Sequence, residues 1–272
     1  MISVEQALAE VLALSPAPVA EHLPLDQAWG RALLEPALSR MTQPPFDASA
    51  MDGYAIRSAD IDQSLLVTGE AAAGHPYSGR AVPGTAVRIF TGAPVPAGYD
   101  RVIMQENVTR DGDRITVADK SGGTNIRPAG DDFREGDRVT PGRRLSAADI
   151  ALLAAMNVPV VAVARRPRVA ILAGGDELVP PGSIPGPGQI ISSNDLAIAA
   201  LARQAGAMPE ILPIARDTEE SLRASFAAAQ GADLLVTIGG ASVGDHDLIG
   251  KVASDLGLQR ASTRSRCGPA SR

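Results

Sequence analysis

The chain has 272 residues, of which 45% are hydrophobic and 21% charged, and its net charge is −6. This length and composition predict a soluble globular protein with two or three domains, and the negative charge argues weakly against a nucleic-acid or anionic-membrane partner. The single cysteine, Cys267, excludes a disulfide framework and fits a reducing compartment. Without a signal-peptide pattern or an apolar run of roughly 18–20 residues, we expect a cytoplasmic protein.

Helical patterns frame the first part of the chain. Residues 3–14 have a helical period, and one face of this segment holds Val4, Ala7, Leu8, Val11 and Leu12. A second short helix is expected over residues 25–34. A third helical pattern occurs in "GRRLSAADIALLAAMNV", where Ser146 is a suitable N-cap and Asp149 its capping-box partner.

Between these helical segments the sequence pattern changes. From about residue 42 to residue 140, short apolar runs such as "AVRIFTG", "RVIMQE", "DRITVA" and "DRVTPG" alternate with Gly, Pro and Asp. Short strands separated by turns of this kind predict a small β-rich domain.

From residue 168 the pattern becomes a strand followed by a helix, three times over. "RVAILAG", "EILPIA" and "DLLVTIGG" are typical of buried strands, whereas "SSNDLAIAALARQAG" and "DTEESLRASFAAAQG" are typical of helices. Ser193 or Asn194 can cap the first of these helices, and Gly206 can end it. This alternation predicts a parallel sheet covered on both faces.

Acidic residues follow each of the three predicted strands. Because ligands of such sheets bind beyond the carboxyl ends of the strands, we expect these acids to lie at one edge and to need a cation. Mg²⁺, which takes one or two carboxylates plus substrate phosphates, is the natural candidate. The acids are Asp176, Glu177, Asp217, Asp245 and Asp247.

The loop "GGASVG" after the last strand can turn several backbone N–H groups toward an oxyanion, and Ser242 can add a hydroxyl donor. Together with the acids, this loop predicts a phosphate-bearing ligand. Each feature also has a structural interpretation, because "GGDEL" can be a strand-ending turn and Asp217 or Thr218 can simply cap a helix. The sequence contains no P-loop and no Rossmann dinucleotide motif.

The stretch "PPFDASAMDGYAIR" interleaves polar and apolar side chains. It suits either a tight turn that opens a β-domain or a loop presented to a partner site. A similar design occurs in "RIFTGAPVPAGYDRVIMQE", with Thr91 at a strand end. In "NIRPAGDDFREGD", Arg127 accompanies Asp131 and Asp132, which can form a surface ion-pair cluster of little energetic value.

Together these motifs resemble the molybdopterin molybdenumtransferases, the MoeA-type proteins related to the C-terminal domain of gephyrin. The matching stretches are "PPFDASAMDGYA", "RIFTGAPVPAGYDRVIMQE", "NIRPAGDDFREGD", "AGGDEL" and "GGASVGDHD", in the family's order and spacing. The resemblance covers about residues 1–258. It implies the last step of molybdenum cofactor assembly, in which molybdate is inserted into adenylated molybdopterin with Mg²⁺ and AMP leaves.

The resemblance also implies residue roles. Catalytic roles fall on Asp52, Thr91, Glu177, Asp217 and Asp247, and the last three are the expected metal ligands. Substrate binding is assigned to Asp132, Asp176, Gly239, Gly240, Ser242, Gly244 and Asp245. We expect electrostatic catalysis without a covalent nucleophile, with Mg²⁺ neutralising the pyrophosphate and backbone N–H groups holding a phosphate oxygen.

The implied fold is α/β and multidomain. It consists of an elongated dimerisation domain over residues 1–41 and 145–166, a β-rich domain over 42–144, and a three-layer αβα domain with a mostly parallel sheet over 167–258. In the implied homodimer, the β-domain of one subunit faces the αβα domain of the other. The expected partners are adenylated molybdopterin, molybdate and a second copy of the chain, with no nucleic acid and no membrane.

The resemblance ends near residue 258. Family members continue for well over a hundred residues, with a "PGKP" segment, a "GLPGNP" loop and a further β-domain, whereas "QRASTRSRCGPASR" lacks an apolar period. We expect a frameshift or premature stop near Leu258, or alternatively a natural disordered tail over 259–272. The αβα domain would then have an open sheet edge, and molybdate insertion would be weak or absent.

Two other functions stay open at this point. The chain can be a catalytically weak module that holds molybdopterin or its adenylate. It can also be a scaffold like gephyrin, which its small size and the absence of a linker disfavour. Release of AMP with Mg²⁺ would separate the enzyme from the binding module, and failure to capture a protein partner would count against the scaffold.

Overall fold

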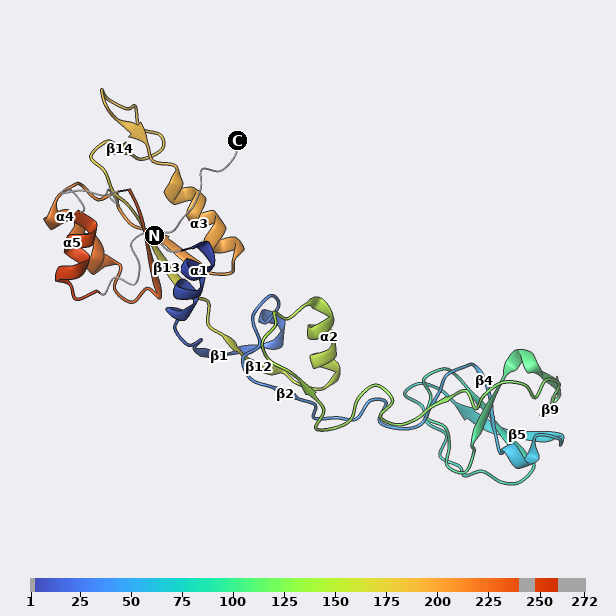
Figure 1. The fold of residues 1–272 in the computed structure, drawn as a ribbon. Coiled ribbons are helices and arrows are strands. Elements are labelled where there is room, and N and C mark those ends of the chain that lie inside the picture. The colour runs from blue at the N-terminus through green and yellow to red at the C-terminus, as the bar shows by residue number, and fades with distance from the viewer. Residues whose placement is uncertain (1–2, 240–247, 259–272) are drawn as a thin grey trace. The chain divides into compact units, whose positions relative to one another are not determined.

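The structure is a computed structural model that describes residues 3–239 and 248–258 (Figure 1). Its contacts divide the chain into two compact units. The central unit runs from His22 to Val163, and the terminal unit combines Met1–Glu21 with Ala164–Arg272. The sequence of the central unit is therefore inserted between two parts of the terminal unit.

A mixed six-stranded sheet forms most of the central unit, in the order β7-β4-β6-β5-β9-β8. Only β5 and β6 pair in parallel, and all other neighbours in this sheet are antiparallel. The strands are β4 (Gly53–Ile56), β5 (Leu65–Ala71), β6 (Thr85–Ile89), β7 (Arg101–Met104), β8 (Val108–Asp111) and β9 (Arg114–Val117). All six strands lie between residues 53 and 117.

Both faces of this sheet are buried at β4 and at the centre of β7. Successive residues of a strand point to opposite faces, yet Tyr54 and Ile56 belong to one buried cluster and Ala55 to another. The same division separates Ile103 from Val102 on β7. The runs "GYAI" and "VIM" are continuously apolar rather than alternating because each face needs its own apolar cover.

Three short strand pairs and one helix complete the central unit's chain. The pairs are β1 (Ala20–Pro24) with β12 (Val160–Ala164), β2 (Ala37–Leu38) with β11 (Arg138–Val139), and β3 (Ala48–Ser49) with β10 (Ile126–Arg127). Helix α2 (Ala147–Ala155) begins at the predicted capping box, in which Ser146 accepts from the N–H of Asp149 at 3.2 Å and Asp149 accepts from the N–H of Ser146 at 2.8 Å. The helix buries Leu153 in a core with Leu33, Leu145 and Val163.

The helix expected over residues 25–34 is wrong. Only a single 3₁₀ turn, Leu25–Gln27, forms there. Beyond it, Ala32 and Leu33 make antiparallel bridges to Arg144 and Val163. The apolar residues of this segment have a helical spacing, but pairing with chain more than a hundred residues away takes their backbone groups instead.

A three-stranded parallel sheet, ordered β16-β13-β17, forms the core of the terminal unit. Its strands are β13 (Arg168–Ala173), β16 (Met208–Ile211) and β17 (Leu234–Ile238), and its helices are α3 (Asn194–Gln204), α4 (Glu219–Ala228) and α5 (Leu248–Asp255). Val169 and Ile171 pack against α3, whereas Ala170 and Leu172 pack with α4 and α5 on the opposite face (Figure 1). Helices therefore lie on both faces of this sheet.

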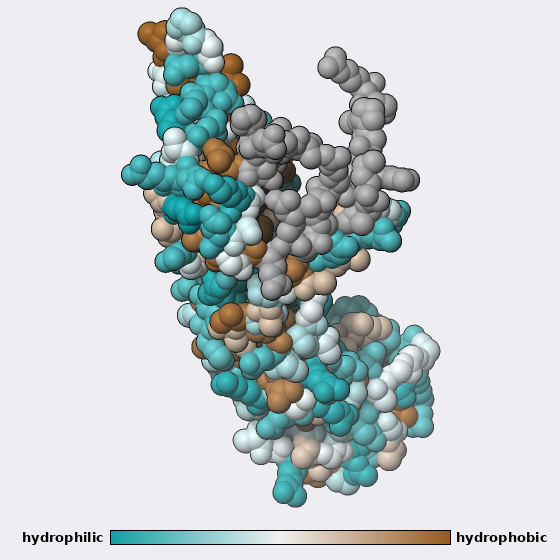
Figure 2. All heavy atoms as spheres, turned by 60° about the vertical axis from the view of Figure 1, so that its left-hand side comes forward, coloured by the Kyte–Doolittle hydropathy of each residue, from teal (hydrophilic) through white to brown (hydrophobic). Residues whose placement is uncertain are grey.

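The N-terminal helix α1 (Val4–Ala13) also has a capping box, formed by Ser3 and Gln6. Its predicted apolar face is present but exposed, with Leu8 57% and Leu12 62% accessible. On the face in Figure 2, hydrophilic residues predominate and apolar residues lie in small separate groups. Every described helix is too short or too polar to cross a lipid bilayer.

Candidate active site

In the central unit, Asp52 and Thr91 form a tight pair. The backbone N–H and the hydroxyl of Thr91 both donate to Oδ1 of Asp52, at 2.8 and 2.7 Å. Asp52 immediately precedes β4 and Thr91 follows β6, and the antiparallel pairing of these strands aligns Gly53 with Ile89. The sheet register therefore brings together two side chains that are 39 positions apart in the sequence.

This pair keeps the Asp52 carboxylate ionised. The backbone N–H of Thr91 and then its hydroxyl lower the pKa of Asp52 below its ordinary value of 3.8; desolvation opposes them, and the positive charge of Arg88 is the smallest contribution. Within the described part of the chain, Oδ2 of Asp52 accepts no hydrogen bond. Asp52 thus offers one oxygen to a ligand while the other is fixed.

The three central sequence motifs meet around this pair. The N–H of Gly92 donates to the carbonyl of Ser49 at 2.8 Å, and Ser49 lies opposite Ile126 in the β3–β10 ladder. The carboxylate of Asp47 accepts from the N–H of Ala129 at 2.9 Å. The stretches that contain residues 46–54, 90–95 and 125–132 therefore form one connected surface.

Asp132 belongs to this surface but is engaged by a neighbour. Nη2 of Arg127 donates to Oδ1 of Asp132 at 2.6 Å, and each side chain is 46% exposed. The charge of Asp132, followed by its hydrogen bond, raises the pKa of Arg127. Arg127 and Asp132 thus form the surface ion pair that the sequence allowed. The assignment of Asp132 to substrate binding stays a prediction.

In the terminal unit, the loops after β13 and β16 meet at the carboxyl edge of the parallel sheet. The N–H of Gly175 donates to the carbonyl of Ala215 at 3.1 Å, and the N–H of Asp217 donates to Oδ1 of Asp176 at 3.4 Å. Nη1 of Arg216 donates to the carbonyl of Asp176 at 3.2 Å. Asp176 and Asp217, predicted from separate strand ends, are therefore neighbours.

Glu177 folds back over the glycine turn that follows β13. Gly175 has a φ of +149°, and a Cβ at this position would lie 2.4 Å from Oε2 of Glu177. The missing side chain therefore leaves the space that the carboxylate occupies. The motif "GGDEL" is a strand-ending turn, as the structural interpretation holds, and the same turn orients Glu177.

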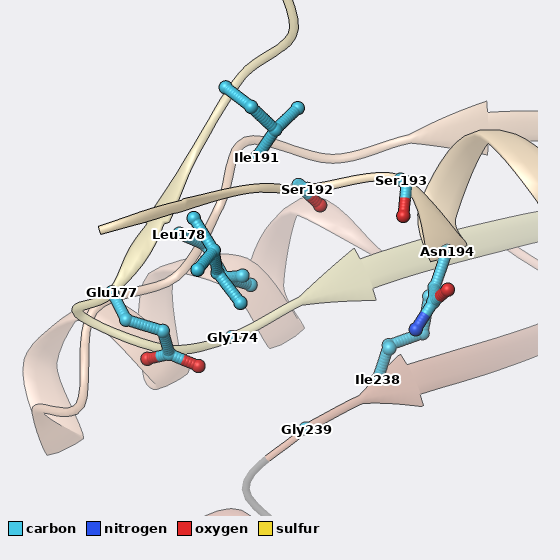
Figure 3. A pocket seen from close by; sticks show the side chains of 10 residues that line it. Gly174, Glu177, Leu178, Ile191, Ser192, Ser193, Asn194, Ile238 and Gly239 are labelled. Carbon is cyan, nitrogen blue, oxygen red and sulfur yellow. The ribbon is translucent and has the colours of Figure 1, made fainter. Parts of the chain in front are cut away.

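A cavity of about 250 Å³ opens beside Glu177 (Figure 3). The ends of β13 and β17, the parallel pair β14 (Leu178–Val179) and β15 (Ile190–Ile191), and the start of α3 surround it. Figure 3 shows Glu177 on one side of the space, with Ser193 and Asn194 on the other. The lining residues are Gly174, Glu177, Leu178, Ile190, Ile191, Ser192, Ser193, Asn194, Ile238 and Gly239.

The cavity wall combines apolar side chains and polar groups in roughly equal measure. Ser193 is the N-cap of α3 but its side chain makes no capping hydrogen bond. The first N–H groups of a helix attract anions, so a negatively charged group suits this end of the cavity. Glu177 and Gly239 are the predicted site residues that line it.

Comparison with known proteins extends over nearly the whole chain. A family model described as "MoeA N-terminal region (domain I and II)" matches residues 2–157, and one described as "Probable molybdopterin binding domain" matches residues 170–266. The chain belongs to the MoeA family. Within that family, its cavity lies in the part that matches the molybdopterin-binding model, and the Asp52–Thr91 pair lies in the N-terminal part.

Individual relatives agree. Proteins named "Molybdopterin molybdenumtransferase" are 40% identical over 249 residues in Nostoc sp. and 38% identical over 264 residues in Haemophilus influenzae, and the matches cover 88% and 94% of this chain. A crystal structure of a MoeA protein from Pyrococcus horikosii has a TM-score of 0.83 at 32% identity over 94% of this chain and 67% of that one. This chain spans 57% and 65% of the length of the two named relatives.

Part of the MoeA-type site lies outside the described residues. These positions are Gly240, Ser242, Gly244, Asp245 and Asp247, which were predicted to bind substrate or metal. In the described ranges, no three His, Cys, Asp or Glu side chains gather as a ready-made metal site. The metal assignment to Glu177, Asp217 and Asp247 therefore stays a prediction.

Sequence reasoning missed two groups of residues near these sites. Ser193 and Asn194 were considered only as helix caps and Ser192 was not considered, although all three line the cavity. Their position, directly after a short apolar run and before a helix in a parallel α/β unit, is a signal that could have indicated a ligand-facing turn. Arg88, whose charge acts on Asp52, carries no such signal because the sheet register alone brings it there.

Proposed function

We propose that this chain acts as a molybdopterin molybdotransferase in molybdenum cofactor biosynthesis. In this reaction, the dithiolene sulfurs of adenylated molybdopterin bond to molybdenum while one oxide of molybdate leaves with the two thiol protons as water. Water cleaves the phosphoanhydride, so that AMP leaves and the pterin keeps its own phosphate. The names of the relatives support a transferase over a module that only binds molybdopterin. They also support molybdopterin and molybdate as the substrates.

One observation carries this proposal. The carboxyl edge of a parallel sheet, in a segment that matches a molybdopterin-binding model, presents acids on two adjacent loops next to a cavity at a helix N-terminus. A planar, phosphate-bearing ligand suits such a place, because the cavity wall offers apolar side chains beside polar ones and the helix end is electropositive. The acids suit the cation that such a phosphate brings with it.

Mg²⁺ is the cation we propose, and the donor set fits it. Mg²⁺ is held by one or two carboxylates plus substrate phosphates, so it does not require the three-residue cluster that the described residues lack. Glu177 and Asp217 would hold it, with Asp247 as the further candidate. When bound, it would supply charge neutralisation at the pyrophosphate.

The residues of the chain have separate tasks in this proposal. Oδ2 of Asp52 and the Thr91 side chain, which belong to the β-rich region, orient the reacting groups of the substrate. The cavity beside Glu177 holds the molybdopterin end. In the proposed homodimer, the β-rich region of one subunit would complete the site of the other, and we place the protein in the cytoplasm.

Release of AMP tests this function. Adenylated molybdopterin, molybdate and Mg²⁺ are incubated with the wild-type chain, with Glu177→Gln and with Asp217→Asn. We expect the rate of AMP release to fall at least about tenfold in both variants. Each variant removes a negative charge that stabilises the transition state more than the ground state. Glu210→Gln is the matched control, since Glu210 is an exposed carboxylate in the middle of β16 whose ion pair with Arg168 is 3.8 Å long.

Wild-type rates in both site variants would contradict the assignment of these acids. Absence of AMP release by the unaltered chain, with normal binding of molybdopterin, would replace the transferase with a binding function. A similar rate loss in Glu210→Gln would indicate a general structural effect instead.

A further inference from the structure

Arg88 occupies an unusual position beside the Asp52–Thr91 pair. It lies on β6 directly opposite Tyr54 of β4. Its Cζ atom lies 4.7 Å from the centroid of the Phe90 ring and 5.1 Å from that of Tyr54. Guanidinium groups bind aromatic faces at such distances, so the two rings fix the plane of this side chain.

Both ends of the guanidinium donate to neutral acceptors. Nη1 donates to the carbonyl of Gly53 at 3.0 Å, and Nη2 donates to Oε1 of Gln105 at 2.6 Å. The N–H of Gln105 in turn donates to the carbonyl of Asp52 at 3.1 Å. The backbone on both sides of the 52–53 peptide bond is therefore tied, directly or through Gln105, to one side chain.

Arg88 forms no ion pair with the described residues. In the described parts of the chain, no carboxylate lies within ion-pair distance of its guanidinium. Packing against the two rings would stabilise the fold equally well if Arg88 did not also hold the peptide after Asp52. The residue also lies three positions before Thr91, so it connects the chain segments that carry both members of the pair.

We propose that Arg88 is a positioning residue that holds the Asp52–Thr91 pair in the orientation needed for molybdate insertion. The guanidinium does this by bracing the peptide after Asp52 between Phe90, Tyr54 and Gln105. This inference rests on the proposed function for its catalytic meaning, whereas its structural part can be measured without substrate. The lowered pKa of Asp52, to which the Arg88 charge contributes, agrees with it.

The test uses Arg88→Lys and Arg88→Gln in the full chain. Lysine keeps the positive charge but not the planar group that donates at both ends. If Arg88 acts by holding the peptide, Arg88→Lys should therefore be as defective as Arg88→Gln. We expect kcat for AMP release to fall about 10- to 100-fold in both variants with little change in KM, as small misplacements of reacting groups do. The Thr91 amide signal in an NMR spectrum should shift in both, because its hydrogen bond to Asp52 is disturbed.

Two further variants keep the test decisive. Arg114→Gln is the matched control, because Arg114 is an exposed arginine of the same sheet that donates to the Ser64 carbonyl at 2.8 Å. Gln105→Ala removes one acceptor of Arg88 without touching its charge, and serves if the Arg88 variants fail to fold. We expect Arg114→Gln to match wild type and Gln105→Ala to show a smaller form of the Arg88 defect.

The outcomes separate this inference from the proposed function. If the Thr91 amide and kcat stay unchanged in Arg88→Lys, while Asp52→Asn lowers kcat for AMP release about 100-fold, the positioning role is wrong and the function stands. If the Arg88 variants shift the Thr91 amide but Asp52→Asn releases AMP normally, Arg88 does orient the pair and the catalytic role of the pair is wrong.

Discussion

The Asp52–Thr91 pair of the central unit and the acidic edge of the terminal unit hold their carboxylates in different ways. Asp52 accepts two short hydrogen bonds from neutral donors, at 2.7 and 2.8 Å. At the acidic edge, the contact from Asp217 to Asp176 is 3.4 Å, and the nearest approach of Arg216 to the Asp176 carboxylate is 4.0 Å. Contacts at these lengths are weak.

This difference indicates which side is organised before a ligand arrives. Neutral donors fix an ionised carboxylate without cancelling its charge, so Asp52 is ready as it stands. Neighbouring carboxylates repel, and only a cation or ligand can draw them close. The acidic edge is therefore the part that a bound ion or substrate would order.

Alanine at two glycines should reveal this difference most strongly. A Cβ at Gly53 would lie 1.9 Å from the backbone carbonyl oxygen of Ile103, whereas a Cβ at Gly175 would meet the movable carboxylate of Glu177. We expect Gly53→Ala to lower the free energy of unfolding by about 3 kcal/mol. Gly175→Ala should cost about 1 kcal/mol, mainly from its backbone conformation. Urea denaturation measures both, and equal losses would contradict a rigid central side.

Removal of one carboxylate from each side should separate their roles in catalysis. We expect Asp52→Asn to lower kcat for AMP release about 100-fold, roughly 2.7 kcal/mol, without altering the Mg²⁺ concentration that gives half the maximal rate. Asp217→Asn should raise that concentration in addition to lowering the rate. The measurement is a Mg²⁺ titration of AMP release by each variant. A shift of the Mg²⁺ dependence in Asp52→Asn would break the comparison.

The Asp52–Thr91 pair should also contribute to stability in a pH-dependent way. The folded-state pKa of Asp52 lies below its ordinary value of 3.8, so its contribution is complete above that value and is lost as the pH falls through the folded-state pKa. Thr91→Val removes the hydroxyl donor only. We expect urea midpoints of wild type and Thr91→Val to differ by a constant amount above about pH 5 and to converge in more acidic solution. A gap that widens on acidification would contradict this sign.

The smallest effect is expected at Arg127. Its ion pair with Asp132 joins two half-exposed side chains, which gain little because water already solvates both. Arg127→Gln should leave the urea midpoint unchanged at physiological salt. A clear drop in that midpoint would mean that this loop is as tightly organised as the Asp52–Thr91 pair.

Local patterns in the sequence predicted the local structure well. The capping box of Ser146 and Asp149 closes over three residues, and Thr218 caps α4 by accepting from the N–H of Ser221 at 3.2 Å. Two of the three strands and the two intervening helices of the terminal unit occur where their apolar periods place them. The strand read from "EILPIA" is displaced and runs from Met208 to Ile211, so it shares only Glu210 and Ile211 with the prediction. Such features form between near neighbours, so a short stretch of sequence contains all that they require.

The sequence by itself therefore determined the α/β alternation, the helix caps and the family to which the motifs belong. Only the tertiary structure decided that Thr91 donates to Asp52 and that Arg88 lies against Tyr54 and Phe90. It also decided that Leu33 pairs with Val163 instead of continuing a helix. Each of these depends on strand register between distant segments. A register shift of one residue turns a side chain to the opposite face, and no local pattern fixes it.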